Sequence, residues 1–480
     1  MKLTLEAAHR NLIQYGVINS GRRAGHSPIA ESETVETKSS GVVKRIFRTA
    51  LIFWVVSALG MSGCGSVPTG TATLAPRPTA ASVTPAPATA TAAIAFTDTP
   101  PPSSPAVTAA ATLRPVSTPG ALSLTLWQSL DRVGAEGRVL TGLVNDYTRQ
   151  NPGLAVDIQT IPDYQVYSRW QSGVAAGTGA DLVLASNDTL GAWVRAGAVA
   201  PLDDQLVGRL EGVSAVAIDS VTVAGHVYGV PGSVQVVALY YRKSAIAAPP
   251  ATTADLLALV KSGKRLVLNA NNYDNFGFFG AFGGQLLDAS GKCTADQGGF
   301  ADAMQYLLDL KVAGASFQAD MTQAPALMAS GAADMIIDGP WALSELEQAL
   351  GDEMGVAPMP AGPSGTARPL ARVESFYINP RSAHVAAAVD LALAIYGAQG
   401  EAQFAAANDP PARTGVAVSD PRVQAFAVAA AAGFPRPLTK EFDNWWGPFG
   451  SMVTMVLNGT STPAAGLRAA CAALNQANGK

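Results

Sequence analysis

The sequence predicts an α/β protein whose folded body has two lobes. Strand-like and helical patterns alternate from Leu122 onward, which is the order of βαβ units with a mostly parallel sheet. The body from Leu122 to Lys480 has about 360 residues, more than one hydrophobic core usually serves. Because 48% of the chain is hydrophobic and only 14% is charged, it has the apolar side chains to fill two large cores.

The elements of this body can be predicted in order. Residues 122–127 alternate as a strand should, and residues 139–150 have helical spacing that ends at Asn151-Pro152-Gly153. A strand over 154–161, a helix over 164–176 and a short apolar strand over 181–185 follow, with further helical patterns over 253–262, 300–313, 341–350 and 383–397. In such a sheet the ligand site lies beyond the carboxyl ends of the strands.

Residues 1–64 are typical of a leader with a lipoprotein signal peptide. A basic cluster begins at Lys44, an apolar run covers 50–59, and small residues lead to Cys64. The end of this segment resembles the bacterial lipobox, which implies lipidation of Cys64. The apolar run is about half of the roughly 20 residues that span a bilayer, although an uncleaved anchor is the alternative. We expect translation to start at Val42 or Val43, directly before the basic cluster.

Residues 65–121 are rich in Ala, Thr and Pro and carry few charges. Such a segment lacks the apolar side chains that offset the entropy of folding, and its prolines keep it extended. We therefore predict a disordered tether that holds the body away from a membrane.

Composition argues against several classes of partner. With 32 Lys and Arg against 36 Asp and Glu, the chain offers no broad cationic surface for nucleic acid. Four His and three Cys leave few ligands for a catalytic zinc site, although carboxylates alone could bind a metal. The sequence also lacks a Walker A loop, a Gly-x-Gly-x-x-Gly fingerprint, a Gly-x-Ser-x-Gly elbow and a His-Glu-x-x-His motif, so we expect no cofactor.

Four stretches carry a family resemblance. Residues 327–346, LMASGAADMIIDGPWALSEL, resemble a signature of a small helix, Gly-x-Ala-x-Met, a strand and Asn/Asp-Gly-Pro-Trp. Residues 181–198, 227–244 and 376–404 resemble three other passages of the same family in the same order. The family is that of the extracellular solute-binding proteins of ABC importers, family 1, in its maltose-binding branch.

This resemblance implies a periplasmic-binding-protein-like type II fold, with a hinge and a cleft between the lobes. By similarity, one lobe covers 122–235 and 360–408, and the other covers 236–359 and 409–480. It also implies a monomer without enzymatic activity, exported and anchored on the outer face of the cytoplasmic membrane. Its expected role is to capture a carbohydrate, a neutral sugar or oligosaccharide, and deliver it to the transmembrane subunits of an ABC permease.

Aromatic residues at matching positions are the first candidates for a sugar site, because sugar rings present flat apolar faces. Trp341, directly after Gly339-Pro340, matches a sugar-stacking Trp of the family. Tyr273, ten residues before Gly283, and Trp446, 13 residues before Gly459, match two further aromatic positions, and Trp445 lies beside Trp446. Core packing is the alternative for each of them.

Polar residues that could grip hydroxyl groups complete the predicted site. By similarity the candidates are Asp131, Arg132, Asp188 and Gln235, joined by Arg372 and Glu374, which could recognise the ligand or pair with each other. Solvated loop positions are the alternative for the first four. The chain departs from the family at Ala185, where maltose-binding proteins carry a stacking Trp, and at Gln235, where they carry Glu. Both departures argue against maltodextrin itself.

Cys293 and Cys471 fall in the same predicted lobe. An exported protein meets oxidising conditions, so a disulfide is one possibility. We expect instead two unpaired, mostly buried thiols, because nothing in the sequence brings the two residues together.

Two other functions fit parts of the sequence. A surface-anchored glycoside hydrolase could use Asp131 and Asp188 as its pair of carboxylates. A receptor of the same fold could bind a non-sugar solute, but we expect few acids near the cleft for a polyamine and few clustered cations for a phosphate ester. The neutral, aromatic character favours a sugar.

Overall fold

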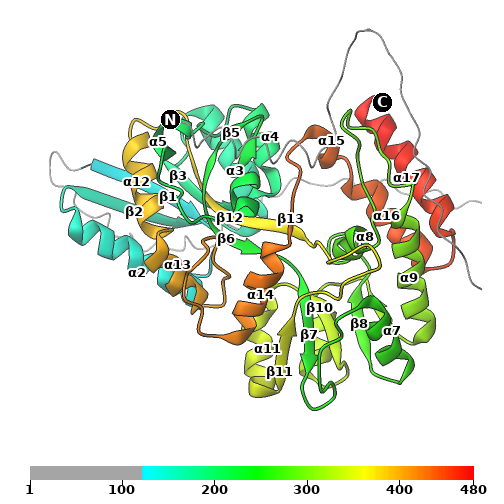
Figure 1. Cartoon of the computed structure of the whole chain (residues 1–480). Coiled ribbons are helices and arrows are strands. Elements are labelled where there is room, and N and C mark those ends of the chain that lie inside the picture. Colours follow the sequence, from blue (N-terminus) through cyan, green and yellow to red (C-terminus); the bar gives the residue numbers. More distant parts are fainter. Residues whose placement is uncertain (1–121) are drawn as a thin grey trace, which may run out of the picture. The chain divides into compact units, whose positions relative to one another are not determined.

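The structure is a computed structural model that describes residues 122–480 (Figure 1). The predicted signal peptide, the lipidation of Cys64 and the tether over 65–121 lie outside the described residues. None of the helices between Leu122 and Lys480 combines the length and apolar character that a membrane-crossing helix needs.

The first sheet contains the strands β1, β2, β3, β6, β12 and β13. They cover Leu122–Gln128, Leu154–Thr160, Leu182–Ser186, Gly229–Gln235, Leu370–Ile378 and Phe434–Pro435, in the order β13-β12-β3-β1-β2 with β6 also paired to β12. β1 runs parallel to β2 and β3, whereas β12 is antiparallel to β3 and β6. The sheet is therefore mixed rather than mostly parallel, because β12 enters it from the second half of the chain and runs back across it.

The two faces of this sheet bury different side chains, as the two-residue period of a strand requires. Leu182 and Leu184 of β3 belong to a core formed with helices α2 (Ala135–Gln150) and α12 (Val385–Ile395). Val183 and Ala185 belong to a core on the opposite face, which contains Trp170 of α3 (Asp163–Ala176) and Trp193 of α4 (Leu190–Arg195). Ala185 is thus a core residue.

The second sheet contains the strands β7 to β11. They cover Ala238–Arg242, Leu266–Asn269, Ser316–Gln318, Met335–Asp338 and Met354–Ala357, in the order β11-β7-β10-β8-β9. β8, β9 and β10 are parallel, and β7 is antiparallel to β10 and β11. The carboxyl ends of β8 and β10 therefore lie at the same edge, at Asn269 and Asp338.

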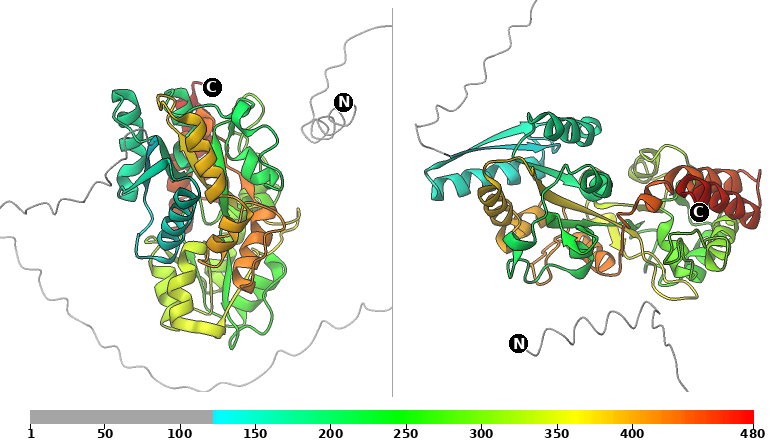
Figure 2. Two further views of the ribbon diagram at one scale, coloured as in Figure 1. Left: turned by 90° about the vertical axis from the view of Figure 1, so that its left-hand side faces the viewer. Right: turned by 90° about the horizontal axis from the view of Figure 1, so that it is seen from above.

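Helices surround this second sheet (Figures 1 and 2). They are α7 (Thr253–Lys261), α8 (Phe276–Ala281), α9 (Gly299–Ala313), α10 (Gln323–Ala329), α11 (Leu343–Leu350), α16 (Trp446–Leu457) and α17 (Pro463–Asn478). α7 starts with a capping box in which Thr252 and Asp255 bond each other's backbone N–H. The C-terminal helix α17 packs on α16 and α9 and closes one side of the second core.

The remaining elements complete the described chain. They are α5 (Asp203–Leu206), α6 (Ala215–Asp219), β4 (Thr222–Val223), β5 (His226–Val227), α13 (Ala398–Ala405), α14 (Pro421–Ala431), α15 (Lys440–Asp443) and the 3-10 turns Asn187–Thr189, Pro340–Ala342 and Gly351–Glu353.

The chain passes between the two sheets several times: between β6 and β7, between β11 and β12, and around β13. In the second passage, the N–H of Ala361 donates to the carbonyl of Ala251 and that of Ser364 to the carbonyl of Ala281, both at 2.9 Å. Residues 361–364 therefore contact residues of the second predicted lobe. The exact division of the chain into lobes remains a proposal.

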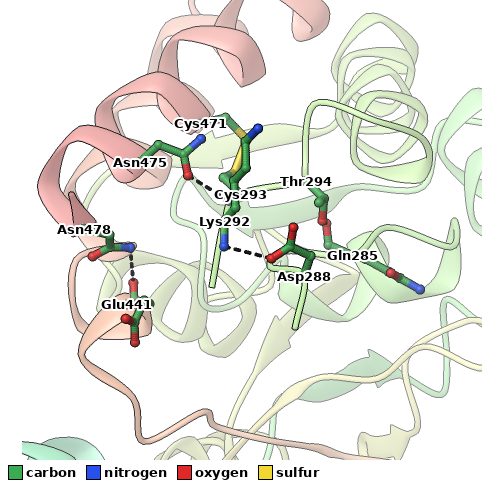
Figure 3. The surroundings of a disulfide bond; sticks show 9 residues. All are labelled: Gln285, Asp288, Lys292, Cys293, Thr294, Glu441, Cys471, Asn475 and Asn478. Atoms are coloured by element: carbon green, nitrogen blue, oxygen red, sulfur yellow. Dashed lines mark hydrogen bonds between the residues drawn. A yellow bond between two sulfur atoms is a disulfide. The ribbon is translucent and has the colours of Figure 1, made fainter. Parts of the chain in front are cut away.

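Cys293 and Cys471 form a disulfide, which corrects the prediction of two free thiols (Figure 3). Cys471 lies on α17 and Cys293 on the loop before α9, with their Cα atoms 5.3 Å apart. The N–H of Cys293 also donates to Oδ1 of Asn475, one turn further along α17, at 2.8 Å. The sequence could not show this proximity because the two cysteines are 178 residues apart.

Candidate functional site

A cavity of about 480 Å³ lies where strand ends of both sheets meet the passage around β13. Its lining consists of three aromatic residues, two arginines, three aspartates, one asparagine and one methionine: Tyr273, Trp341, Trp446, Arg372, Arg436, Asp188, Asp274, Asp338, Asn269 and Met321. Five of these are predicted site residues, namely Tyr273, Trp341, Trp446, Asp188 and Arg372.

The three aromatic rings stand side by side and form the aromatic wall of the cavity. The ring centre of Tyr273 is 6.3 Å from that of Trp341 and 6.5 Å from that of Trp446, with the planes tilted by 39° and 33°. Trp341 is 48% exposed, although it belongs to a residue type that is mostly buried. These rings offer flat apolar surface to a ligand.

The position of Trp341 follows from its local sequence. β10 ends at Asp338, and Gly339-Pro340 turn the chain into the 3-10 turn that carries Trp341. A Cβ atom at Gly339 would lie only 2.2 Å from the Trp341 ring, so the ring folds back over a position where only glycine fits. The turn thereby presents the ring at the cavity.

Trp445 is not part of the aromatic wall, which corrects the prediction for this residue. It is fully buried and stacks on Phe442, with ring centres 5.2 Å apart. Neighbouring residues at the start of a helix point in directions about 100° apart, so one of the two tryptophans faces the cavity and the other faces the core.

Two arginines hold Asp188 in the lining of the cavity. Arg436 donates from Nη1 to Oδ1 of Asp188, and Nε of Arg372 lies 3.6 Å from Oδ2. Burial opposes ionisation of Asp188, but the two guanidinium groups outweigh it and lower the pKa of this carboxyl. Asp188 is therefore an ionised acceptor with fixed orientation.

Arg372 and Glu374 pair with each other, which was one of the two predicted possibilities. Nη2 of Arg372 lies 3.0 Å from Oε1 of Glu374. Burial raises the pKa of Glu374 to about 7, against the attraction of Arg372. Arg372 lines the cavity, whereas Glu374 lies behind it.

Gln235 also lies behind the cavity lining rather than in it. Its Oε1 accepts a hydrogen bond of 2.8 Å from Nη1 of Arg372, and its Nε2 donates to Oδ1 of Asp409 at 2.9 Å. Gln235 therefore positions Arg372. Its neutral amide can both accept from the guanidinium and donate to the carboxyl, which a glutamate could do only when protonated.

Asp131 and Arg132 do not line this cavity. Both are exposed in the turn before α2, where Oδ1 of Asp131 accepts the N–H of Val133 at 3.1 Å. Both follow the first strand, but the structure does not bring them to the cavity lining.

The second sheet contributes three polar residues that the sequence analysis missed. Asn269 and Asp338 end β8 and β10, and Nδ2 of Asn269 donates to Oδ2 of Asp274 at 2.9 Å. Burial raises the pKa of Asp338 to about 7, and the nearby Asp274, whose pKa burial also raises, adds to this shift. The sequence did contain a signal for two of these residues, because Asn269 and Asp338 stand at the ends of short apolar strands. The expectation of few acids near the cleft was wrong.

Besides Met321, which also lines the cavity, one more lining residue was missed, namely Arg436. It follows β13 in a Pro435-Arg436-Pro437 segment that shows neither strand nor helix periodicity, so no pattern in the sequence marks it.

Within residues 122–480, no group of three His, Cys, Asp and Glu side chains is arranged to hold a metal ion.

The two α/β sheets, with a cavity where their strand ends meet, define the class of two-lobed binding-protein folds. The sequence model of the bacterial extracellular solute-binding proteins matches residues 142–431, and the chain belongs to this family of exported binding proteins.

Individual relatives agree with this assignment. A maltotriose-binding protein of Pyrococcus abyssi is 23% identical over 252 residues, which cover 50% of this chain and 54% of that protein. The maltodextrin-binding protein MdxE of Bacillus subtilis is 27% identical over 216 residues, 40% of this chain and 50% of that protein. The chain thus spans about half the length of the curated relatives it matches.

Solved structures extend the likeness to the whole body. A Thermus thermophilus maltotriose binding protein, solved with maltotriose bound, is 26% identical and superimposes with a TM-score of 0.63. The match covers 74% of this chain and 100% of that one. These similarities confirm the predicted fold class.

Proposed function

We propose that this protein captures a neutral carbohydrate in the cavity and delivers it to the membrane subunits of an ABC permease. The observation that carries the proposal is the aromatic wall of Tyr273, Trp341 and Trp446, set beside oriented charged groups. Flat rings bind the apolar faces of a sugar, and the charged groups at their edges bind its hydroxyls.

The roles of individual residues follow from their positions. Trp341 is the most exposed ring of the aromatic wall, with Tyr273 and Trp446 beside it, and it stacks on a sugar ring. Asp188 accepts hydrogen bonds from the hydroxyl groups of the sugar. We expect closure of the lobes on a ligand to bring Asp131 and Arg132 into contact with it, because a ligand favours the closed state only by contacting both lobes.

The setting of the protein is part of the same proposal. A lipid on Cys64 and a tether over 65–121 would hold the body, as a monomer, at the outer face of the cytoplasmic membrane. The membership in an extracellular family supports this setting, and so does the disulfide between Cys293 and Cys471, because disulfides persist in oxidising compartments.

A glycoside hydrolase remains the second candidate, and the positions of its two carboxylates argue against it. Asp131 does not line the cavity that contains Asp188, and Asp188 is ionised and held by two arginines, which removes it as a proton donor. A non-sugar ligand is the third candidate. The three aspartates would suit a cationic solute, but Asp188 is already held by two arginines, and the pKa of Asp338, which burial raises to about 7, reduces the charge of that carboxyl near neutral pH.

A thermal-shift screen of the purified protein tests the proposal, because a ligand that binds only the folded state raises the melting temperature. We expect a shift with one or more neutral mono- or oligosaccharides. Shifts with charged compounds alone would contradict the proposal, and release of reducing ends from the oligosaccharides would favour the hydrolase.

A further inference from the structure

Arg436 bridges three parts of the candidate site. It lies on the passage around β13, its Nη1 donates to Asp188 of the first lobe, and its guanidinium carbon is 5.0 Å from the ring centre of Trp446 in the second lobe. The side chain is only 7% exposed, yet it lines the cavity. A buried arginine in this position can contact a ligand that lies against the aromatic wall.

The donors of Arg436 are largely unused. A guanidinium group has five N–H donors, and a buried donor without an acceptor is costly. Within residues 122–480, the hydrogen bond to Asp188 uses Nη1, whereas Nε is buried and has no partner. Arg372 differs, since Gln235, Glu374 and Asp188 each occupy one of its nitrogens. Arg436 is therefore the arginine of the cavity with free capacity for an acceptor.

The charges around Arg436 indicate which acceptor it takes. Asp188 already balances its charge through the ion pair, and Glu374 pairs with Arg372. An anionic ligand group would thus meet no excess of positive charge. A neutral oxygen, such as a hydroxyl or ring oxygen, satisfies the unused donors without adding a buried charge.

We propose that Arg436 is a ligand-contacting, specificity-determining residue, which donates hydrogen bonds to one neutral oxygen of the sugar ring that rests against the aromatic wall. This inference rests on the proposed function. It assigns a binding role to a residue that sequence patterns do not mark, and it predicts that one particular oxygen of the ligand controls affinity.

Calorimetric titration with the neutral sugar that gives the largest thermal shift tests the role. In Arg436→Met, affinity should fall about 10- to 100-fold, the usual effect of losing a hydrogen bond to a charged group. Arg436→Lys keeps the charge near Asp188 but loses the planar fork, and should show an intermediate loss. This second variant keeps the test valid if the methionine variant does not fold.

Arg195→Met is the matched control for a purely structural role. Arg195 holds the same passage, through Asp443 and the carbonyl of Leu438, but it does not line the cavity. Its loss should leave affinity within about threefold of wild type. If Arg195→Met and Arg436→Met weaken binding equally, the contact role is wrong.

Deoxy analogues of the same sugar give the decisive measurement. The wild type should bind the analogue that lacks the contacted oxygen at least about tenfold more weakly than the parent sugar, and Arg436→Met should bind both equally. Unchanged discrimination in the variant would overturn the inference while leaving the proposed function intact. Absence of any carbohydrate binding by the wild type would overturn both.

Discussion

The hydroxyl of Tyr240 donates a hydrogen bond of 2.7 Å to the carbonyl oxygen of Gly339, two residues before Trp341. Tyr240 is fully buried in β7, next to β10 in the sheet. The bond fixes the turn that carries Trp341 to the core of the second lobe. The most exposed ring of the aromatic wall thus stands on a rigid support, which is the arrangement that precise ligand binding requires.

Replacement of Gly339 by alanine tests this support. The new Cβ would lie 2.2 Å from the Trp341 ring and must displace it. We expect sugar affinity to fall about tenfold, with a modest loss of stability because the ring is half exposed. Gly447→Ala in α16 is the control, since nothing lies within 4 Å of its added Cβ, and its affinity should be unchanged. Unaltered binding by Gly339→Ala would show that the ring position is not critical.

Trp341→Ala should abolish the thermal shift caused by the best sugar ligand. The ring is 48% exposed, so its loss should change the free energy of unfolding by less than about 1 kcal/mol while removing most of the stacking surface. Trp445→Phe provides the contrast, because Trp445 is a core residue: the melting temperature should drop, and the ligand-induced shift should persist. Chemical denaturation and calorimetry of both variants separate stability from affinity.

Asp338 should make stability depend on pH. The pKa of this carboxyl is about 7 in the folded protein and ordinarily 3.8. At a pH between these two values, the folded state keeps a proton that the unfolded chain has released. The stabilising contribution of protonated Asp338 is therefore complete below about pH 4 and is lost as the pH rises through about 7. Asp338→Asn mimics the protonated form. Its free energy of unfolding should exceed that of the wild type by an amount that grows as the pH rises over this interval, toward an upper bound of about 4 kcal/mol.

Asp334, the residue directly before the same strand, is the control for this prediction. Hydrogen bonds from Arg265 lower its pKa, so its contribution has the opposite sign: it is present above the ordinary pKa of 3.8 and is lost as the pH falls through the lower folded value. Asp334→Asn should therefore be destabilising at pH 7. Urea denaturation at several pH values measures both effects, and parallel curves for wild type and Asp338→Asn would contradict the first.

The disulfide between Cys293 and Cys471 should stabilise the second lobe. The link joins residues 178 apart, so its removal raises the conformational entropy of the unfolded chain. The double variant Cys293→Ala/Cys471→Ala should therefore lose about 2–5 kcal/mol of unfolding free energy. Guanidinium denaturation measures the loss. Thiol titration in denaturant should find neither cysteine reactive before reduction and both reactive afterwards. Sugar affinity should be unchanged, because neither residue lines the cavity.

Much of the fold and part of the site could be predicted from local patterns. Alternating and helical spacings depend on backbone geometry over a few residues, and they identified the α/β class. The Asp-Gly-Pro-Trp segment marked Trp341 for the same reason, since the turn and the exposed ring are consecutive in the chain. Local patterns did not show that β12 runs antiparallel to β3, because that pairing joins distant segments.

The sequence by itself determined which segments form strands and helices and which short motif presents a tryptophan. Only the tertiary structure decided that Trp446 faces the cavity while Trp445 faces the core, that Arg436 meets Asp188 across 248 residues, and that the two cysteines pair. The physical reason is that contacts between distant residues depend on how the whole chain packs. No spacing within a single element records that packing.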